Sequence, residues 1–465
     1  MPDAVVVGSG PNGLAAAITL AREGRSVLVL EAAETLGGGM RSAELTEPGF
    51  LHDVCSAIHP TAVASPFLSE LPLAEHGLEL VHPPAPLAHP LEDGTAVMLE
   101  RSVELTSSQL GADAERYRRL FSPLVRDKGR LLPFLLGSRP LPRHPVAAVR
   151  FGLLGLRSAI GLVRRFEDPR ARVLFAGLAA HSIQSLRRSP TASFGLVLGL
   201  LGHAYGWPLA RGGSQAIADA MASYLRSLGG ELETGRRVDS VDELPKARTT
   251  LLDLTPREVI RIAGHRLPQR YLRSLRRYRY GPGVFKLDLA LDGPVPWAAE
   301  ECRRAATLHL GGSLEEIVES EDAVWRNRVS DRPFVLAAQP SLFDESRAPE
   351  GKHTLWAYCH VANGWPGDMT EAIERQIERF APGFRDLVRA RATRSAPQFE
   401  AYNPNYAGGD INGGVQDVFQ LYTRPAPRLN PYSTPVEGLY LCSSATPPGG
   451  GVHGMCGHLA ARSTL

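Results

Sequence analysis

A glycine-rich turn near the start of the chain constrains the fold more than any other feature of the sequence. The apolar run AVVVG leads into a GxGxxG motif formed by Gly8, Gly10 and Gly13. The following segment, LAAAITLAREG, has the apolar spacing of a helix and ends at a glycine, and SVLVLE is a second apolar run that ends at Glu31. This order predicts a strand, a turn, a helix and a strand, which is a βαβ unit of the Rossmann type.

The motif has the residue types that bind an adenosine diphosphate group. Gly8 permits the tight turn, Gly10 lets the backbone approach a pyrophosphate, and Gly13 lets the helix pack closely on the strand. The pyrophosphate would lie on the free N–H groups of the helix N-terminus. Glu31 is placed to accept hydrogen bonds from a ribose 2′-hydroxyl, which argues against a 2′-phosphate there. NAD and FAD both satisfy these requirements.

The composition predicts an ordinary folded protein without strong charge. The 465 residues are enough for about three domains, or for two with insertions. The formal net charge is only +2, so we expect no nucleic-acid partner. The 5 cysteines contain no CxxC pair, so neither a disulfide framework nor a zinc site is indicated, and no metal is expected. The segment after Met1 has no signal-peptide pattern, which predicts a cytoplasmic protein.

The most apolar stretch, residues 145–166, does not have the pattern of a membrane span, because Arg150, Arg157 and Arg164 interrupt it. On one continuous helix these arginines form a stripe. The apolar residues opposite that stripe are Val146, Leu153, Leu154, Ile160 and Leu162. Two placements are open for such a basic amphipathic helix: it packs on the protein's own core, or it makes peripheral contact with a membrane.

The segment after Glu31, ETLGGGMRS, favours FAD over NAD. It gives a second close approach of the backbone and supplies Arg41, a cation suited to phosphate. Here the sequence resembles the phytoene desaturase-like family of FAD-dependent oxidoreductases, which includes phytoene dehydrogenases, carotenoid isomerases and retinol saturase. In that family the GxGxxG motif, the ribose Glu and a GG-x-x-R segment bind FAD in succession. The resemblance gives a cofactor-binding role to Gly8, Gly10, Pro11, Asn12, Gly13, Glu31, Gly37, Gly38, Met40 and Arg41.

Two later segments extend the resemblance. Residues 210–241 look like the family's helix and strand whose backbone meets the adenine, here at Val238. Residues 438–461 look like the C-terminal flavin motif, in which a final helix would direct its N-terminal N–H groups at the flavin. The cofactor contacts implied in this motif are those of Ser443, Ser444, Gly451, Val452 and His453.

The resemblance implies a Rossmann-like FAD-binding domain, of the GR2 flavoprotein type, joined to a discontinuous α+β substrate domain. We expect the FAD-binding domain in residues 1–65, 205–265 and 430–465, and the substrate domain in residues 66–204 and 266–429. Apolar spacing predicts mainly helices in the first insertion, and alternation in GVFKLDLAL and KHTLWAYCHV predicts a mixed or antiparallel sheet in the second. No second GxGxxG opens a βαβ unit, so a resident NAD(P)H is not expected.

The expected function is oxidation of a largely apolar small molecule by hydride transfer to flavin N5, with oxygen or a quinone as the final acceptor. A proton acceptor is also needed, and the candidates are His59, His453 and Tyr406. His59 is the preferred base, because a helix N-terminus lowers the basicity of His453. His181 and His203, in an apolar segment, are expected to be core histidines. Two alternatives stay open: a redox-neutral isomerase of a polyene, and a flavin-binding protein without turnover.

Overall fold

A parallel sheet assembled from distant segments of the chain carries the glycine turn. The structure is a computed structural model that describes residues 1–137 and 143–465. The strand order of this sheet is β16-β10-β1-β2-β9, and β1 pairs with both β10 and β2. The strands are β1 (Ala4–Val7), β2 (Val27–Leu30), β9 (Glu231–Glu233), β10 (Thr249–Leu252) and β16 (Leu439–Leu441). This arrangement is the Rossmann-like fold that the sequence predicts.

Both faces of the parallel sheet are buried, which explains why β1 and β2 are unbroken apolar runs. Ala4 and Val6 share a core with α1 (Pro11–Arg22), α10 (Gln215–Ser227) and α17 (Met455–Arg462). Val5 and Val7 share a second core with α11 (Pro256–Ala263) and α12 (Gln269–Arg276). Alternate residues of one short strand therefore enter two different cores.

The turn between β1 and α1 depends on close contacts between backbones. Gly8 has a φ of 100°, a conformation that side chains rarely adopt. A Cβ on Gly13 would overlap the carbonyl oxygen of Gly8, and a Cβ on Gly457 in α17 would overlap the carbonyl oxygen of Asn12. Helix α1 is thus held against the turn on one side and against α17 on the other.

A second, mixed sheet has the strand order β15-β11-β14-β13-β12-β6-β7. The pair β6 and β12 is parallel, and the other pairs are antiparallel. Its strands are β6 (Ala85–Pro90), β7 (Ala96–Leu99), β11 (Gly283–Leu291), β12 (Ala305–Leu310), β13 (Val335–Ala338), β14 (His353–Val361) and β15 (Val388–Arg394). Residues 66–204, which the sequence indicates to be mainly helical, therefore also supply β6 and β7. The segment EDG between these strands forms their turn.

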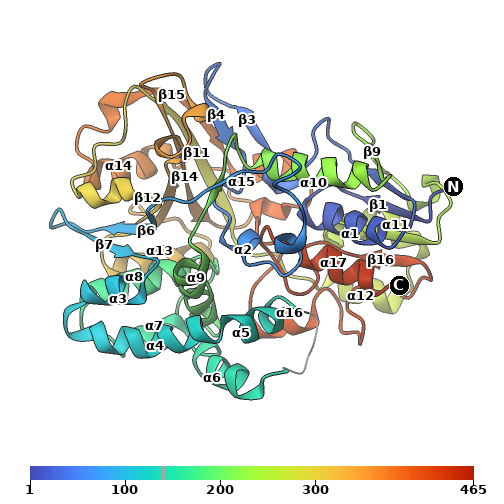
Figure 1. Cartoon of the computed structure of the whole chain (residues 1–465), viewed down its shortest axis with the longest axis horizontal. Coiled ribbons are helices and arrows are strands. Elements are labelled where there is room, and N and C mark those ends of the chain that lie inside the picture. The colour runs from blue at the N-terminus through green and yellow to red at the C-terminus, as the bar shows by residue number, and fades with distance from the viewer. Residues whose placement is uncertain (138–142) are drawn as a thin grey trace.

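Helices cover both faces of the mixed sheet. Ile373, Ile377 and Phe380 of α14 (Thr370–Phe380) pack on one face. The other face belongs to a hydrophobic core that it shares with α3 (Val103–Ser108), α4 (Ala114–Arg126), α5 (Lys128–Leu135), α6 (Pro145–Gly155), α7 (Ala159–Val163), α8 (Pro169–Ala180), α9 (Thr191–Tyr205) and α13 (Leu314–Trp325). Figure 1 shows these helices at one end of the molecule, and the parallel sheet with both chain termini at the other.

Short elements connect the two ends of the molecule. The strands β3 (Ser42–Glu44) and β4 (Leu51–Asp53) form an antiparallel pair, as do β5 (Leu80–Val81) and β8 (Leu209–Ala210). The remaining helices are α2 (Pro60–Val63), α15 (Ala396–Tyr402) and α16 (Val418–Thr423). The exact residue bounds of the two domains stay a prediction.

Residues 145–166 do not form the single amphipathic helix that their spacing predicts. The helix breaks after Gly155 and restarts at Ala159, where the side chain of Ser158 caps the N-terminus of α7. Val146 and Leu153 are 79% and 69% exposed instead of packed on the core. The buried side of α6 consists of Ala147, Phe151 and Gly155. These three residues, rather than Val146 and Leu153, face the protein. Across the described ranges no helix has the length and apolarity of a membrane span.

Candidate active site

One elongated cavity connects the glycine turn of the parallel sheet to the mixed sheet. At the first end it is lined by Gly8, Gly10, Pro11, Asn12, Glu31 and Val238. Gly38, Arg41, Tyr406, Ser444, Gly451 and Val452 line its middle part. Apart from Tyr406, these residues come from three distant parts of the chain, as the sequence predicts for a cofactor site. Gly13, Gly37, Met40, Ser443, His59 and His453 are not among the lining residues.

Glu31 is held in place by hydrogen bonds at the first end of the cavity. Its Oε2 accepts hydrogen bonds from the N–H and the hydroxyl of Ser9, at 2.9 and 2.6 Å. Its Oε1 accepts from the N–H of Ala33 and from Nη2 of Arg41, both at 2.9 Å. The carboxylate is therefore oriented and charge-balanced at the end of β2, where a ribose hydroxyl can donate to it. Arg41, expected as a phosphate ligand, also serves as the ion-pair partner of Glu31.

Asp253 is a site residue that the sequence analysis did not identify. It directly follows β10, and its Oδ2 accepts a hydrogen bond of 2.9 Å from the N–H of Gly13. Burial, together with the nearby negative charge of Glu31, raises the pKa of Asp253 to about 7, against the lowering effect of the hydrogen bond from the Gly13 N–H. The sequence does contain a signal for this residue, an acid at the carboxyl end of the apolar run TTLLD. The sequence alone does not show that this run pairs with β1.

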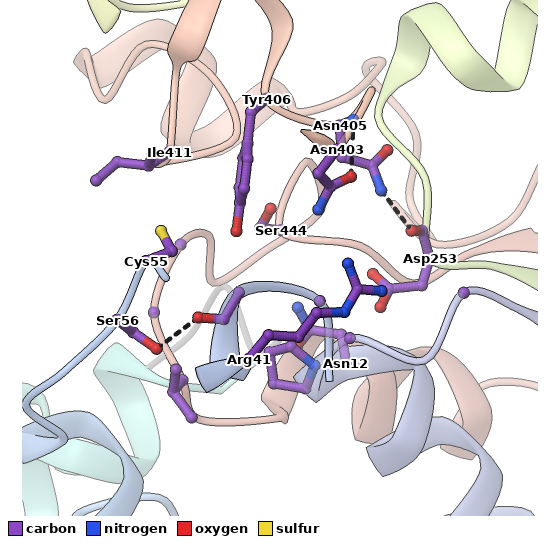
Figure 2. Close-up of a pocket in the computed structure, with 18 of the residues that line it drawn as sticks. Asn12, Arg41, Cys55, Ser56, Asp253, Asn403, Asn405, Tyr406, Ile411 and Ser444 are labelled. Carbon is purple, nitrogen blue, oxygen red and sulfur yellow. Dashed lines mark hydrogen bonds between the residues drawn. The ribbon is translucent and has the colours of Figure 1, made fainter. Parts of the chain in front are cut away.

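A tyrosine and a glycine lie close together in the cavity wall. Figure 2 shows Tyr406 descending toward the segment that carries Cys55 and Ser56. A Cβ on Gly39 would lie 2.6 Å from the Tyr406 hydroxyl oxygen, so this third glycine of the GGG run makes room for the tyrosine. Burial raises the pKa of the Cys55 thiol and that of Tyr406. Both side chains are therefore neutral hydrogen-bonding groups at neutral pH.

The two histidines proposed as catalytic lie behind the cavity wall. Nε2 of His59 is 2.8 Å from the hydroxyl of Ser214, and burial lowers the pKa of His59 to about 4. Nδ1 of His453 accepts a hydrogen bond of 3.0 Å from the N–H of Met455 in the first turn of α17, and burial lowers the pKa of His453 to about 4. Of the three proposed catalytic residues, this geometry brings only Tyr406 to the cavity.

The far end of the cavity is apolar and aromatic. Its lining residues include Leu198, Trp207, Leu336, Ala337, Ala338, Trp356, Tyr358 and Ile411. Trp356 and Tyr358 stand on the same face of β14, with ring centroids 4.9 Å apart and an interplanar angle of 77°. The alternation of KHTLWAYCHV predicts this strand, but it does not indicate which of its faces meets the cavity.

The residues of the first end and the middle fit an FAD molecule. Asn12 Oδ1 and Asn412 Nδ2 are buried polar atoms without a partner among the described residues, and both side chains belong to cavity-lining residues. A Cβ on Gly38 would lie 3.0 Å from the Cα of Gly10, so the two glycine segments approach each other closely. Glycine backbone, unpaired amides and an oriented carboxylate are the groups that a dinucleotide requires.

Known proteins agree with this assignment. The sequence matches the model of the family described as flavin containing amine oxidoreductase over residues 12–457. It is 26% identical to pyridine nucleotide-disulfide oxidoreductase domain-containing protein 2 of Mus musculus, with 99% of this chain and 92% of the mouse protein covered. It is 25% identical to phytoene desaturase (neurosporene-forming) of Rhodobacter capsulatus, with 98% and 92% covered. Cyclohexylamine oxidase from Brevibacterium oxydans shares the fold, with a TM-score of 0.62, 17% identity and coverage of 99% and 97%.

The fold and the cavity together define an FAD-dependent oxidoreductase. The chain belongs to the flavin containing amine oxidoreductase family, and its relatives confirm the resemblance to phytoene desaturases. FAD is the cofactor of the enzyme.

The position of Asp253 leads to a prediction about FAD affinity and pH. Above a pH of about 7 the carboxylate of Asp253 is negative and repels the pyrophosphate, whereas below it the side chain is neutral. FAD should therefore bind about tenfold more tightly at about pH 6 than at about pH 8, a difference of about 1.4 kcal/mol. Fluorescence titration of the apoprotein measures this difference.

The matched variant is Asp253→Asn, whose amide oxygen can still accept the hydrogen bond from Gly13. Its FAD affinity should show a much smaller dependence on pH. The same pH dependence in the variant and the wild type would contradict the role given to Asp253.

Proposed function

We propose that the enzyme is a dehydrogenase or desaturase that oxidises a largely apolar small molecule. The observation that carries this proposal is the division of the cavity into a polar end at the glycine turn and an apolar, aromatic end at the mixed sheet. When FAD is bound at the polar end, it accepts a hydride at N5. The apolar end then binds the carbon skeleton of the substrate, excludes water and fixes the orientation of the reacting carbon.

The distribution of charge supports an apolar substrate over a cationic amine. The carboxylates that line the cavity in the described part of the chain are those of Glu31, Asp253 and Glu258. All three lie beside the parallel sheet, at the dinucleotide end of the cavity. Glu31 directly follows β2, Asp253 directly follows β10, and Glu258 is in α11. No carboxylate of the described residues lines the aromatic end, where an ammonium group would need one.

The proton that leaves with the hydride goes to water in this proposal. Tyr406 lines the cavity but, with its raised pKa, acts as a hydrogen-bond donor that positions the substrate and not as a base. His59 and His453 do not line the cavity, so neither is assigned contact with the substrate. Oxygen or a quinone is the proposed final electron acceptor.

A redox-neutral isomerase of a polyene is the second candidate function. One observation favours it: among the described residues that line the aromatic end, none would act as a base at neutral pH. The pKa of Cys55 is raised by burial, and the pKa of His181 is lowered by burial to about 3. An isomerisation without net oxidation needs no proton acceptor for a substrate proton.

Anaerobic spectroscopy separates these two functions. In the proposed dehydrogenase, mixing the yellow enzyme with a substrate under anaerobic conditions should bleach the flavin absorption, because electrons stay on the cofactor. Oxygen or a quinone should restore the colour. Product formed from an enzyme with reduced flavin, with no net electron transfer, would instead establish the isomerase and contradict the dehydrogenase.

We also propose that α6 contacts an anionic membrane surface from which an apolar substrate is taken. Val146, Val149, Leu153 and Leu156, which we call the α6 face, are between 53% and 79% exposed. Arg150 and Arg157 lie on the same short segment and are exposed. Exposed aliphatic side chains beside arginines are the combination that binds the boundary of an anionic bilayer.

Vesicle co-sedimentation tests the α6 face. The wild type should bind vesicles that contain phosphatidylglycerol, and the double variant Val149→Glu/Leu153→Glu should lose most of this binding while it keeps FAD. Leu429→Glu, a change at another fully exposed leucine, is the matched control and should bind as the wild type does. Equal vesicle binding by the wild type and the double variant would contradict this contact.

A further inference from the structure

His181 is a polar side chain in the apolar end of the cavity. It follows α8 directly and lines the cavity together with Leu198, Trp207 and Leu336. Its ring makes an edge contact with Trp207, with centroids 5.7 Å apart. The apolar sequence context predicts a core histidine here, and neither the FAD site nor the hydride transfer requires a histidine at this position.

A second histidine fixes one nitrogen of the His181 ring. Nε2 of His181 lies 2.9 Å from Nε2 of His309 on β12, so one of the two nitrogens carries a proton and the other accepts it. Burial and the proximity of His360 lower the pKa of His181 to about 3, and burial lowers that of His309 well below its usual value. Both rings are therefore neutral at neutral pH, and each has a single N–H.

The surroundings of His309 decide which ring donates. Nδ1 of His309 is buried and has no partner among the described residues. If His181 donated the hydrogen bond, the single proton of His309 would be on Nδ1, where a buried N–H would have no acceptor. If His309 donates instead, its Nδ1 is an unprotonated nitrogen without a donor, which costs less free energy. His309 therefore donates its Nε2–H to Nε2 of His181. The proton of His181 must then be on Nδ1.

The Nδ1–H of His181 has no hydrogen-bond partner among the described residues. This nitrogen is also not one of the fully buried polar atoms that lack a partner, so part of its surface is exposed. The atom is therefore accessible, and the ring to which it belongs borders the cavity. A neutral N–H donor among apolar side chains marks a place where a ligand can supply an acceptor.

We propose that His181 is a specificity-determining residue that donates a hydrogen bond from Nδ1 to an oxygen atom of the substrate. The substrate class is then a largely apolar molecule with one accepting oxygen, such as an alcohol, aldehyde or ketone, and not a pure hydrocarbon. This inference rests on the proposed function, because it assigns the apolar end of the cavity to the substrate. A hydrocarbon leaves the N–H without an acceptor, which penalises its binding.

A pair of probes of equal shape tests this assignment on the FAD-loaded enzyme. The probes are methyl undecyl ketone and the alkene in which a CH₂ group replaces the carbonyl oxygen. Calorimetry or the change in flavin absorption gives the dissociation constant of each, without any need for turnover. Replacing His181 by Phe should lower the preference for the ketone over the alkene by about threefold to tenfold, the usual contribution of a neutral hydrogen bond.

Two further variants separate the hydrogen bond from general damage to the site. His181→Gln, which retains an N–H donor, should recover part of the preference for the ketone. His265→Phe, at an exposed histidine away from the cavity, should keep the wild-type preference. An unchanged ratio of the two dissociation constants in His181→Phe would overturn the role of His181 and leave the proposed function intact. If the wild type binds neither probe, the apolar substrate site itself is contradicted.

A measurement on the wild type keeps the inference testable if His181→Phe does not fold. Nitrogen NMR of ¹⁵N-histidine-labelled enzyme distinguishes protonated from unprotonated ring nitrogens. The expected result for His181 is a protonated Nδ1 and an unprotonated Nε2. The opposite tautomer would overturn the inference, because the accessible nitrogen of the His181 ring would then be an acceptor.

Discussion

The close approach of backbones at the glycine turn is the constraint on which the rest of the site depends. Only a hydrogen atom fits at Gly13, against the carbonyl oxygen of Gly8, and only a hydrogen atom fits at Gly457, against the carbonyl oxygen of Asn12. These contacts fix α1 between the parallel sheet and α17. Helix α17 begins at Met455, shortly after the glycine loop at residues 449–451. The same packing therefore brings the cavity-lining residues of this loop near the N-terminal turn.

The cavity derives its function from the different chemistry of its two ends. The parallel sheet ends in polar groups that suit a charged dinucleotide, with Glu31 oriented by Ser9, Ala33 and Arg41. The mixed sheet presents Trp356 and Tyr358 on its inner face. Tyr406, which meets Gly39, lies between the two ends. The middle of the cavity is thus where a bound flavin and an apolar substrate would meet.

The sequence predicts the parts of the site that depend on local patterns. Gly8 and Gly10 of the GxGxxG motif, Glu31 and the C-terminal glycine loop line the cavity, because turns and strand ends are encoded by residues close in the chain. Asp253 was missed because its place beside Gly13, 240 residues earlier in the chain, depends on the pairing of β10 with β1. The break between α6 and α7 was also missed, since no proline marks it in the sequence.

The direction of individual side chains is the information that the sequence does not supply. Ile58 and Pro60 line the cavity, whereas His59 between them points to Ser214. Val452 lines the cavity, whereas the next residue, His453, caps α17. A segment can therefore be assigned to the site correctly while its most reactive side chain turns away. His181 is the reverse case, since an apolar sequence context concealed a residue of the cavity wall.

The cofactor bound by the purified enzyme, in the wild type and in two matched variants, tests the central claim most directly. The account predicts a yellow protein from which acid releases FAD, and not FMN or NAD. Glu31→Gln should weaken FAD binding by about 1.5–3 kcal/mol, because it removes a charged acceptor for the ribose. Glu34→Gln, at a nearby exposed acid outside the cavity lining, should bind FAD as the wild type does. A folded, colourless wild type that does not take up added FAD would contradict the account.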